Sequence, residues 1–165
     1  GETNLVGVLV SSAVKKPLAQ YLQEKIWQPA GMEAPATWLL GQTGHEIAGC
    51  CIQAATRDFA RFGLFVLANG NAGGKQIVPT DWFSMATVKQ KDIGEPGHGY
   101  GFQWWTYDDG SFAAQGIFGQ GIFIDPKRKL VIASNANWTR ATMGPEPEAR
   151  EAFYHRVQGL IDAGR

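Results

Sequence analysis

Several features are scarce in this sequence, and each scarcity excludes a class of protein. Among the 165 residues, 15 Lys and Arg balance 15 Asp and Glu, so the formal net charge is zero. Nucleic-acid-binding domains normally carry a basic excess, so we expect no nucleic-acid partner. The longest notable apolar run, residues 5–10, is far too short to span a bilayer, so we expect no membrane span. With 44% hydrophobic and 18% charged residues, intrinsic disorder is excluded as well.

Potential metal and phosphate ligands are also few. The three histidines, His45, His98 and His155, lie far apart in the sequence, and none belongs to a paired ligand motif. Residues 97–101 are rich in glycine, but their spacing fits no phosphate-binding loop. We therefore expect no metal and no other cofactor.

The two cysteines, Cys50 and Cys51, are adjacent. Neighbouring residues rarely satisfy the geometry of a disulfide, so we expect two buried thiols. Cysteine usage therefore leaves the cellular compartment open. Because the sequence begins with Gly1 rather than Met, we expect a processed or truncated chain.

A nucleophile is equally hard to find. The Gly-x-Ser-x-Gly elbow of one large group of serine hydrolases does not occur. Ser12 and Lys15 have the Ser-x-x-Lys spacing, which on a helix places a lysine amine one turn from a serine hydroxyl. However, Lys16 follows directly and does nothing to bury or deprotonate that amine. We interpret the pair as exposed and without a catalytic role.

The apolar periodicity changes character along the chain. Helices are predicted over residues 17–28, from a cap at Thr56 to about residue 69, and after a cap at Thr80. Strands are predicted over residues 99–107, 112–125 and 129–135, and a last helix carries Ala149, Phe153, Val157 and Leu160 on one apolar stripe. Residues 5–10 have the propensity of a strand.

These elements predict the α+β class, with an antiparallel sheet flanked by helices. Residues 130–133 are apolar without alternation, as in a strand that is covered on both faces. We expect one domain, with residues 1–98 as its mainly helical part and residues 99–165 as its antiparallel strands and C-terminal helix.

The most informative stretch is residues 115–126, where Gly116, Gly119 and Gly121 interrupt an expected strand. Glycine weakens a strand, so it indicates a bulge or a close approach of another backbone. A strand without side chains can also present a main-chain N–H to a developing oxyanion. The residues alone leave the structural and the catalytic explanation equally open.

The sequence pattern of this stretch resembles the third motif of the serine β-lactamase-like superfamily. That group contains class C β-lactamases, penicillin-binding-protein-like esterases and 6-aminohexanoate-dimer hydrolases. The Gly-Ile-aromatic-Gly-Gln pattern of residues 116–120 is most similar to the last branch. Other segments match in the same order: residues 18–32, 55–63, 99–105, 123–126 and 130–132.

The resemblance implies a partial β-lactamase/transpeptidase-like fold, in which residues 5–10 lie on a helix. It also implies a serine hydrolase that cleaves amide or ester bonds of small molecules through an acyl-enzyme. The family's Ser-x-x-Lys and tyrosine would lie upstream, so this chain would be the C-terminal portion. Its expected partner is the missing N-terminal half, or a second copy of itself. The protein could be located in a bacterial periplasm or in the cytoplasm, and the residues do not distinguish the two.

By the same resemblance, the Ile117 N–H is the expected oxyanion donor. The family's third motif often begins with Lys or His, whereas Ala114 stands here. Without that cation a carboxylate-bearing β-lactam loses an electrostatic anchor, which favours amide or ester substrates. The expected substrate-binding residues are Gln115, Gly116, Phe118, Trp104 and Trp105, although a core role for the two tryptophans is equally open.

A non-enzymatic alternative is an aromatic platform that binds a glycan or a peptide. Its rings would be Trp104, Trp105, Tyr107 and Trp138. Such a platform requires two or more of these rings to be exposed and roughly coplanar. The hydrolase interpretation instead requires the Ile117 N–H to line a cleft that is left open where other strands should pack, and to be free of ladder pairing.

Overall fold

The computed structural model describes residues 1–164, and these form an α+β structure. The helices are α1 (Glu2–Val14), α2 (Leu18–Leu22), the π-helical turn η1 (Gln23–Trp27), α3 (Thr56–Leu67), α4 (Trp82–Ala86) and α5 (Glu146–Ala163). The main strands are β5 (His98–Tyr100), β6 (Trp105–Tyr107), β7 (Phe112–Gln115), β8 (Gly121–Asp125) and β9 (Leu130–Ser134). Two short hairpins add β1 (Thr37–Trp38), β2 (Ile52–Gln53), β3 (Asn71–Ala72) and β4 (Lys75–Gln76).

The five main strands form one antiparallel sheet in the order β5-β6-β7-β8-β9. Each strand pairs with the next along the chain, so β5 and β9 lie at the edges. In the centre, Ala113 of β7 lies opposite Phe123 of β8, and Gln115 lies opposite Gly121. The register therefore places the turn over residues 116–120 at one end of the sheet.

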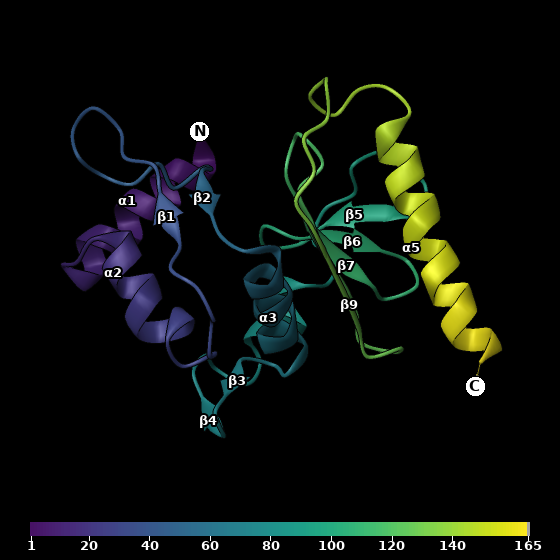
Figure 1. The fold of residues 1–165 in the computed structure, drawn as a ribbon, viewed down its shortest axis with the longest axis horizontal. Coiled ribbons are helices and arrows are strands. Elements are labelled where there is room, and N and C mark those ends of the chain that lie inside the picture. Colours follow the sequence, from purple (N-terminus) through teal and green to yellow (C-terminus); the bar gives the residue numbers. More distant parts are fainter. Residues whose placement is uncertain (165) are drawn as a thin grey trace.

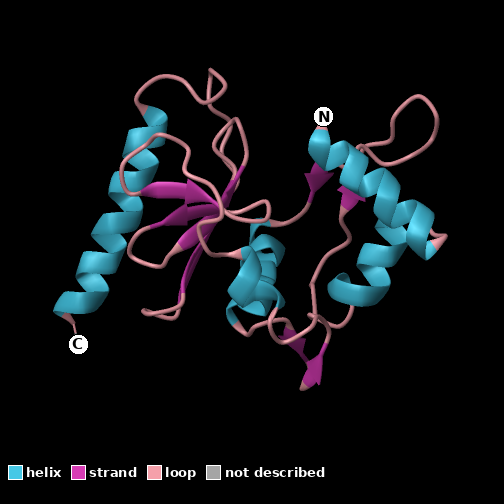
Figure 2. Cartoon of the chain, turned by 180° about the vertical axis from the view of Figure 1, so that it is seen from behind, coloured by secondary structure: helices cyan, strands magenta, loops and turns pink. Residues whose placement is uncertain are grey.

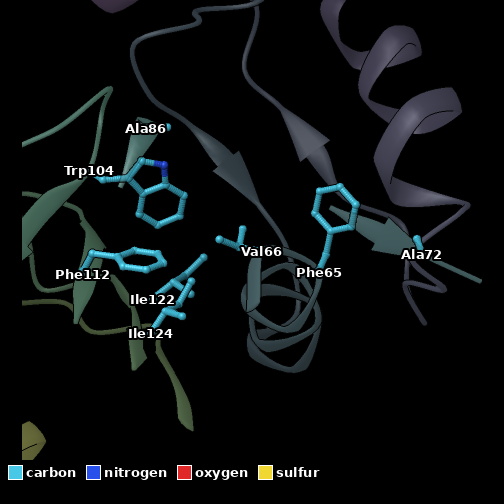
Figure 3. Packing of buried hydrophobic residues seen from close by; sticks show 8 residues of the cluster. All are labelled: Phe65, Val66, Ala72, Ala86, Trp104, Phe112, Ile122 and Ile124. Atoms are coloured by element: carbon cyan, nitrogen blue, oxygen red, sulfur yellow. The ribbon is translucent and has the colours of Figure 1, made fainter. Parts of the chain in front are cut away.

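Helices cover both faces of this sheet. In Figure 1, α5 lies across one face and α3 lies against the other. The alternation along β8 explains how both faces are filled, since Ile122 and Ile124 join the cluster that contains Phe65 and Val66 of α3 (Figure 3). Phe123 points the other way.

Phe123 contacts α5, where its ring stacks on Tyr154 with the ring centroids 4.3 Å apart. The continuous apolar run of β9 has the same explanation, because Val131 packs on the α3 side and Leu130 and Ile132 pack on the α5 side. The prediction of an antiparallel sheet flanked by helices is confirmed, and so is a strand covered on both faces.

The N-terminal elements α1, α2, β1 and β2 lie on the far side of α3 from the sheet (Figure 1). Figure 2 shows α1, α2 and the β1–β2 hairpin together there, with the N-terminus among them and the C-terminus beyond α5. Residues 5–10 are helical, as the family resemblance implies and against their strand propensity. Within residues 1–164, no helix is both long enough and apolar enough to cross a membrane.

Three expectations about secondary structure are wrong in detail. Residues 112–125 form two strands and a turn rather than one strand, because the glycines allow the chain to reverse. Residues 99–107 likewise split into β5 and β6, since Gln103 between them has a φ of 67°. The caps are displaced by one residue: Ala55 precedes α3 and Asp81 precedes α4.

The expectation of two buried thiols is also wrong. Cys50 and Cys51 form a disulfide with each other, and Cys50 is exposed. Cys51 adopts a φ of 79°, in the left-handed region that residues other than glycine rarely adopt. The backbone at this pair is therefore not extended. The carbonyl of Cys50 accepts a hydrogen bond from the indole of Trp38 over 3.0 Å, which attaches this loop to β1.

The apolar stripe expected on the last helix does not face the sheet. Phe153 is 53% exposed and Leu160 is 62% exposed. The buried positions are Tyr154 and Gln158, and half-buried Arg150 lies one turn before Tyr154. The face of α5 that packs on the sheet therefore carries polar residues, while two large apolar side chains of the helix are exposed, which departs from the usual amphipathic rule.

Candidate active site

The turn between β7 and β8, residues 116–120, is fixed by its own hydrogen bonds. The Gly116 N–H donates to the Gln120 carbonyl over 2.8 Å, and the Gly119 N–H donates to the Gly116 carbonyl over 3.1 Å. The Phe118 N–H donates to the side-chain oxygen of Gln120 over 3.3 Å. The backbone of this turn is therefore organised without any ligand.

The segment that follows β9, residues 134–142, holds the same turn from outside. The Thr142 N–H donates to the Ile117 carbonyl over 2.8 Å, and the Trp138 N–H donates to the Phe118 carbonyl over 3.0 Å. Gly119 has a φ of 89°, and a Cβ atom there would overlap the indole of Trp138. The glycine thus provides the close approach that its position in the sequence predicted.

The Ile117 N–H differs from the amides on either side of it. Within residues 1–164 it donates no hydrogen bond, although the Ile117 carbonyl is bonded to Thr142. The residue is 58% exposed. A main-chain donor without an acceptor, on a fixed backbone, is the kind of group that can stabilise a developing oxyanion.

The side-chain amide of Gln115, the last residue of β7, forms hydrogen bonds through both its nitrogen and its oxygen. Its Nε2 donates to the Tyr107 hydroxyl over 2.8 Å, and its Oε1 accepts from Nη2 of Arg150 over 2.6 Å. Burial raises the pKa of Tyr107, and the Glu151 carboxylate nearby raises it further, so the hydroxyl stays protonated. The sequence alone does not indicate a role for Arg150, because this residue lies far downstream of Gln115. It also belongs to a helix whose apolar side was expected to face the core.

The structure separates the aromatic residues that the sequence singled out. Trp104 is 8% exposed and packs edge-to-face on Phe112 in the core, with ring centroids 5.3 Å apart (Figure 3). Trp105 is 36% exposed and Phe118 is 38% exposed, but the ring contacts within residues 1–164 include none between them. Trp138 is half-buried.

This arrangement contradicts the aromatic-platform alternative. Of its four rings, Trp104 lies in the core and Tyr107 and Trp138 are half-buried. Trp105 is the exposed one, and it meets Tyr100 at an interplanar angle of 78° rather than in a common plane. The requirement for two exposed coplanar rings is therefore not met.

Two cavities lie away from the β7–β8 turn. One, of about 400 Å³, lies between the α2–η1 segment and residues 32–38, with Trp27 and Trp38 in its wall. The other, of about 290 Å³, lies beside α3 and is lined in part by Arg61 and Phe65. Neither borders on Ile117, so the cleft expected at the Ile117 N–H is not one of these two cavities.

The other candidates from the sequence remain apart from the turn. Ser12 and Lys15 are both exposed, and Lys15 ends α1 with a φ of 56°, as expected for a solvated pair. His98 lies 3.4 Å from a carboxylate oxygen of Glu151, which links β5 to α5. Within residues 1–164, no group of three or more His, Cys, Asp or Glu residues is arranged to hold a metal ion.

Known proteins resemble this chain over most of its length. It is 26% identical to the 6-aminohexanoate-dimer hydrolase of Paenarthrobacter ureafaciens over 99% of this chain and 43% of that protein. A solved structure described as a 6-aminohexanoate-dimer hydrolase of Bacillus anthracis superposes with a TM-score of 0.82 and 32% identity, over 95% of this chain and 42% of that one.

More distant structures share the fold alone. A β-lactamase-like protein of Bacteroides dorei superposes with a TM-score of 0.69 at 16% identity, over 94% of this chain and 55% of that one. A penicillin-binding-protein homologue of Caulobacter crescentus superposes with a TM-score of 0.64 at 15% identity, over 81% of this chain and 50% of that one.

The family model described as Beta-lactamase matches residues 1–156 of this chain. The chain spans 43% of the length of the Paenarthrobacter relative and 42% of the Bacillus structure, and it corresponds to their C-terminal portion. The chain therefore belongs to the β-lactamase family of serine hydrolases.

Proposed function

We propose that this chain completes the active site of a serine hydrolase that cleaves amide or ester bonds through an acyl-enzyme. In this proposal the Ile117 N–H donates a hydrogen bond to the oxygen of the reacting carbonyl. The observation that carries the proposal is that the Ile117 N–H has no acceptor within residues 1–164, while the carbonyl of this exposed residue is bonded.

The N-terminal portion of the catalytic domain supplies the rest of the chemistry. Its serine hydroxyl, activated by the lysine and tyrosine of the family, attacks the substrate carbonyl. The carbonyl oxygen becomes an oxyanion that the Ile117 N–H and the N–H of the serine stabilise. The amine or alcohol then leaves, and water hydrolyses the acyl-enzyme and regenerates the serine.

The substrate we propose is a small amide or ester rather than a penicillin-type β-lactam. Ala114 stands where the family often has a cation, so the motif itself offers no charge to a substrate carboxylate. Exposed Phe118 and Trp105 offer apolar surface to an acyl chain, and Gln115 and Gly116 border the oxyanion position. Buried Trp104 packs on Phe112 at the other end of β7, so we assign it a core role rather than a contact with substrate.

The partner we propose is the N-terminal portion of such a domain. Helix α1 exposes apolar side chains, among which Leu5 is 69% exposed and Leu9 is 68% exposed. Within residues 1–164, strand β9 pairs with β8 alone, so its outer edge is open to a further strand. In this proposal the complementary portion covers both surfaces.

The proposal can be tested with a chimaera in which this chain replaces the C-terminal portion of the Bacillus anthracis relative. Hydrolysis of p-nitrophenyl esters and of 6-aminohexanoate dimer, with labelling by a fluorophosphonate, reports the reconstituted site. Mixing the two portions as separate chains should restore the same hydrolysis. The 165-residue chain alone should not be labelled, and stoichiometric labelling of Ser12 would contradict our interpretation of that residue.

The main-chain donor is tested by replacing Ile117 with its α-hydroxy acid, which substitutes an ester oxygen for the N–H. We expect kcat to fall by about 10²–10³-fold. Ile117→Val keeps the N–H and should stay close to the unmodified chimaera. If the hydroxy-acid variant kept its kcat, the assignment of Ile117 would be wrong, and a folded chimaera without hydrolysis or labelling would refute the proposed function.

A further inference from the structure

Helix α5 delivers a positive charge to the strand end that carries the proposed oxyanion donor. Nη2 of Arg150 lies 2.6 Å from Oε1 of Gln115. The guanidinium carbon lies 4.9 Å from the centre of the Trp138 ring, within the range of a cation–π contact. Nε and Nη1 of Arg150 are buried, and neither has a hydrogen-bond partner within residues 1–164.

These contacts determine where the guanidinium lies. Buried N–H groups without acceptors are unfavourable, so a free side chain would turn toward water. The hydrogen bond to Gln115 and the stacking on Trp138 are the contacts that oppose this. The position of Arg150 is therefore tied to those two residues.

The contact with Arg150 also fixes which way the Gln115 amide points. A guanidinium can only donate, so Oε1 of Gln115 must face Arg150 and Nε2 must face away from it. Nε2 then donates to the hydroxyl of Tyr107 on β6. One side-chain amide thus links α5, β7 and β6 immediately before Gly116 and Ile117.

The second contact reaches the same turn from its other side. The backbone N–H of Trp138 donates to the Phe118 carbonyl, and the indole lies against Gly119. Arg150 stacks on that indole. The guanidinium therefore contacts both the residue that precedes the turn and the residue that covers it, and Ile117 lies between those two attachments.

We infer that Arg150 is a positioning residue, which holds Gln115 and Trp138 so that the Ile117 N–H faces the reacting carbonyl. This inference rests on the proposed function of Ile117. Arg150 is not assigned to the substrate or to any proton transfer. Lysine cannot replace it, because an ammonium lacks the planar fork that bonds an amide and stacks on an indole at the same time.

The inference is tested in the chimaera with Arg150→Ala, Arg150→Lys and Gln115→Leu, with Arg156→Ala as control. Arg156 is an exposed arginine on the same helix. A displacement of the donor of about 1 Å can cost on the order of 10²-fold, so we expect kcat of Arg150→Ala to fall by about tenfold to a hundredfold with KM little changed. Arg150→Lys should not restore kcat, and added guanidinium should restore part of it in Arg150→Ala.

Coupling between the two residues gives a second kinetic readout. If Arg150 acts through Gln115, the double variant should lose no more than the larger single loss. Fully additive losses, or a loss confined to KM, would overturn the inference. So would a kcat of Arg150→Ala equal to that of Arg156→Ala.

The 165-residue chain provides a readout that does not depend on activity. In a ¹⁵N–¹H spectrum, Arg150→Ala should shift the amide resonances of Ile117 and Phe118 and leave those of α1 in place, whereas Arg156→Ala should leave all of them in place. Unchanged Ile117 and Phe118 resonances would overturn the positioning inference even if Ile117 is the oxyanion donor. An inactive chimaera with the expected spectral shifts would instead overturn the proposed function.

Discussion

The carboxylate of Asp58 offers a strong test of the physical reasoning, because it is fully buried and its partners are known. It has 0% exposure and accepts hydrogen bonds from the backbone N–H groups of Glu33 (2.8 Å) and Ala34 (3.1 Å). It also accepts from Nη1 of Arg61 over 2.9 Å. Asp58 thus attaches residues 33–34 to α3.

Removal of this carboxylate by Asp58→Ala leaves two backbone donors without an acceptor. Each buried unsatisfied donor costs about 1–3 kcal/mol, and removing one partner of a buried ion pair costs about 3–5 kcal/mol. Arg61 is only partly buried and keeps its contact with Glu33 at 3.0 Å, so its own loss is smaller. We expect the free energy of unfolding to fall by about 3–5 kcal/mol.

The assay is urea unfolding of the 165-residue chain, followed by tryptophan fluorescence and circular dichroism. With an m-value of about 1–3 kcal/mol/M, the midpoint should fall by more than about 1 M at unchanged m. Asp58→Asn should lose less, because its amide oxygen still accepts one backbone N–H while its NH₂ group faces the other. Exposed Asp81→Asn is the matched control and should change stability by less than about 0.5 kcal/mol. A loss below about 1 kcal/mol for Asp58→Ala would refute the reasoning.

Two further predictions concern the sheet and its turn. Gly119→Ala should destabilise the chain by more than about 1 kcal/mol in thermal unfolding and alter tryptophan fluorescence, whereas Gly74→Ala, which has a positive φ but open space around it, should show the backbone cost without the fluorescence change. Burial alone would raise the pKa of Asp125, but hydrogen bonds from Arg128 and Gln158 outweigh it and hold the pKa below its usual value. The stability from this carboxylate is therefore complete above pH ~4 and is lost as the pH falls through its folded-state pKa. The urea midpoint should fall on acidification below pH ~4, and it should fall less in Asp125→Asn; an equal fall would contradict the assignment.

The sequence predicted the elements whose periodicity directly reflects burial. The apolar run of β9 indicated a strand covered on both faces. Helix α3 is the helix that was expected from Thr56 onward. The glycines of residues 116–121 indicated a close approach, and the structure identifies it as that of Trp138 to Gly119. The family resemblance corrected the strand propensity of residues 5–10, because tertiary context decides such short apolar runs.

What could not be predicted depends on contacts between distant parts of the chain. The Cys50–Cys51 disulfide needs the left-handed backbone of Cys51, which local sequence does not reveal. Arg150 donates a hydrogen bond to Gln115, which lies 35 residues away, and no pattern near either residue predicts this bond. The apolar stripe of the last helix was assigned to the wrong face for the same reason, because polar residues can face a sheet when it offers them polar partners.

The polar face of α5 has a physical explanation in the length of the β7–β8 hairpin. Arg150 bonds Gln115, which lies opposite the first residue of β8, and Gln158 bonds Asp125, the last residue of β8. The eight steps from Arg150 to Gln158 rise by about 12 Å along the helix, and the four steps from Gly121 to Asp125 span about 14 Å along the strand. Tyr154 stacks on Phe123 midway between the two bonds. The spacing of three side chains on one helix thus matches both ends and the centre of one strand, so α5 fixes the hairpin along its whole length and holds the turn that carries Ile117.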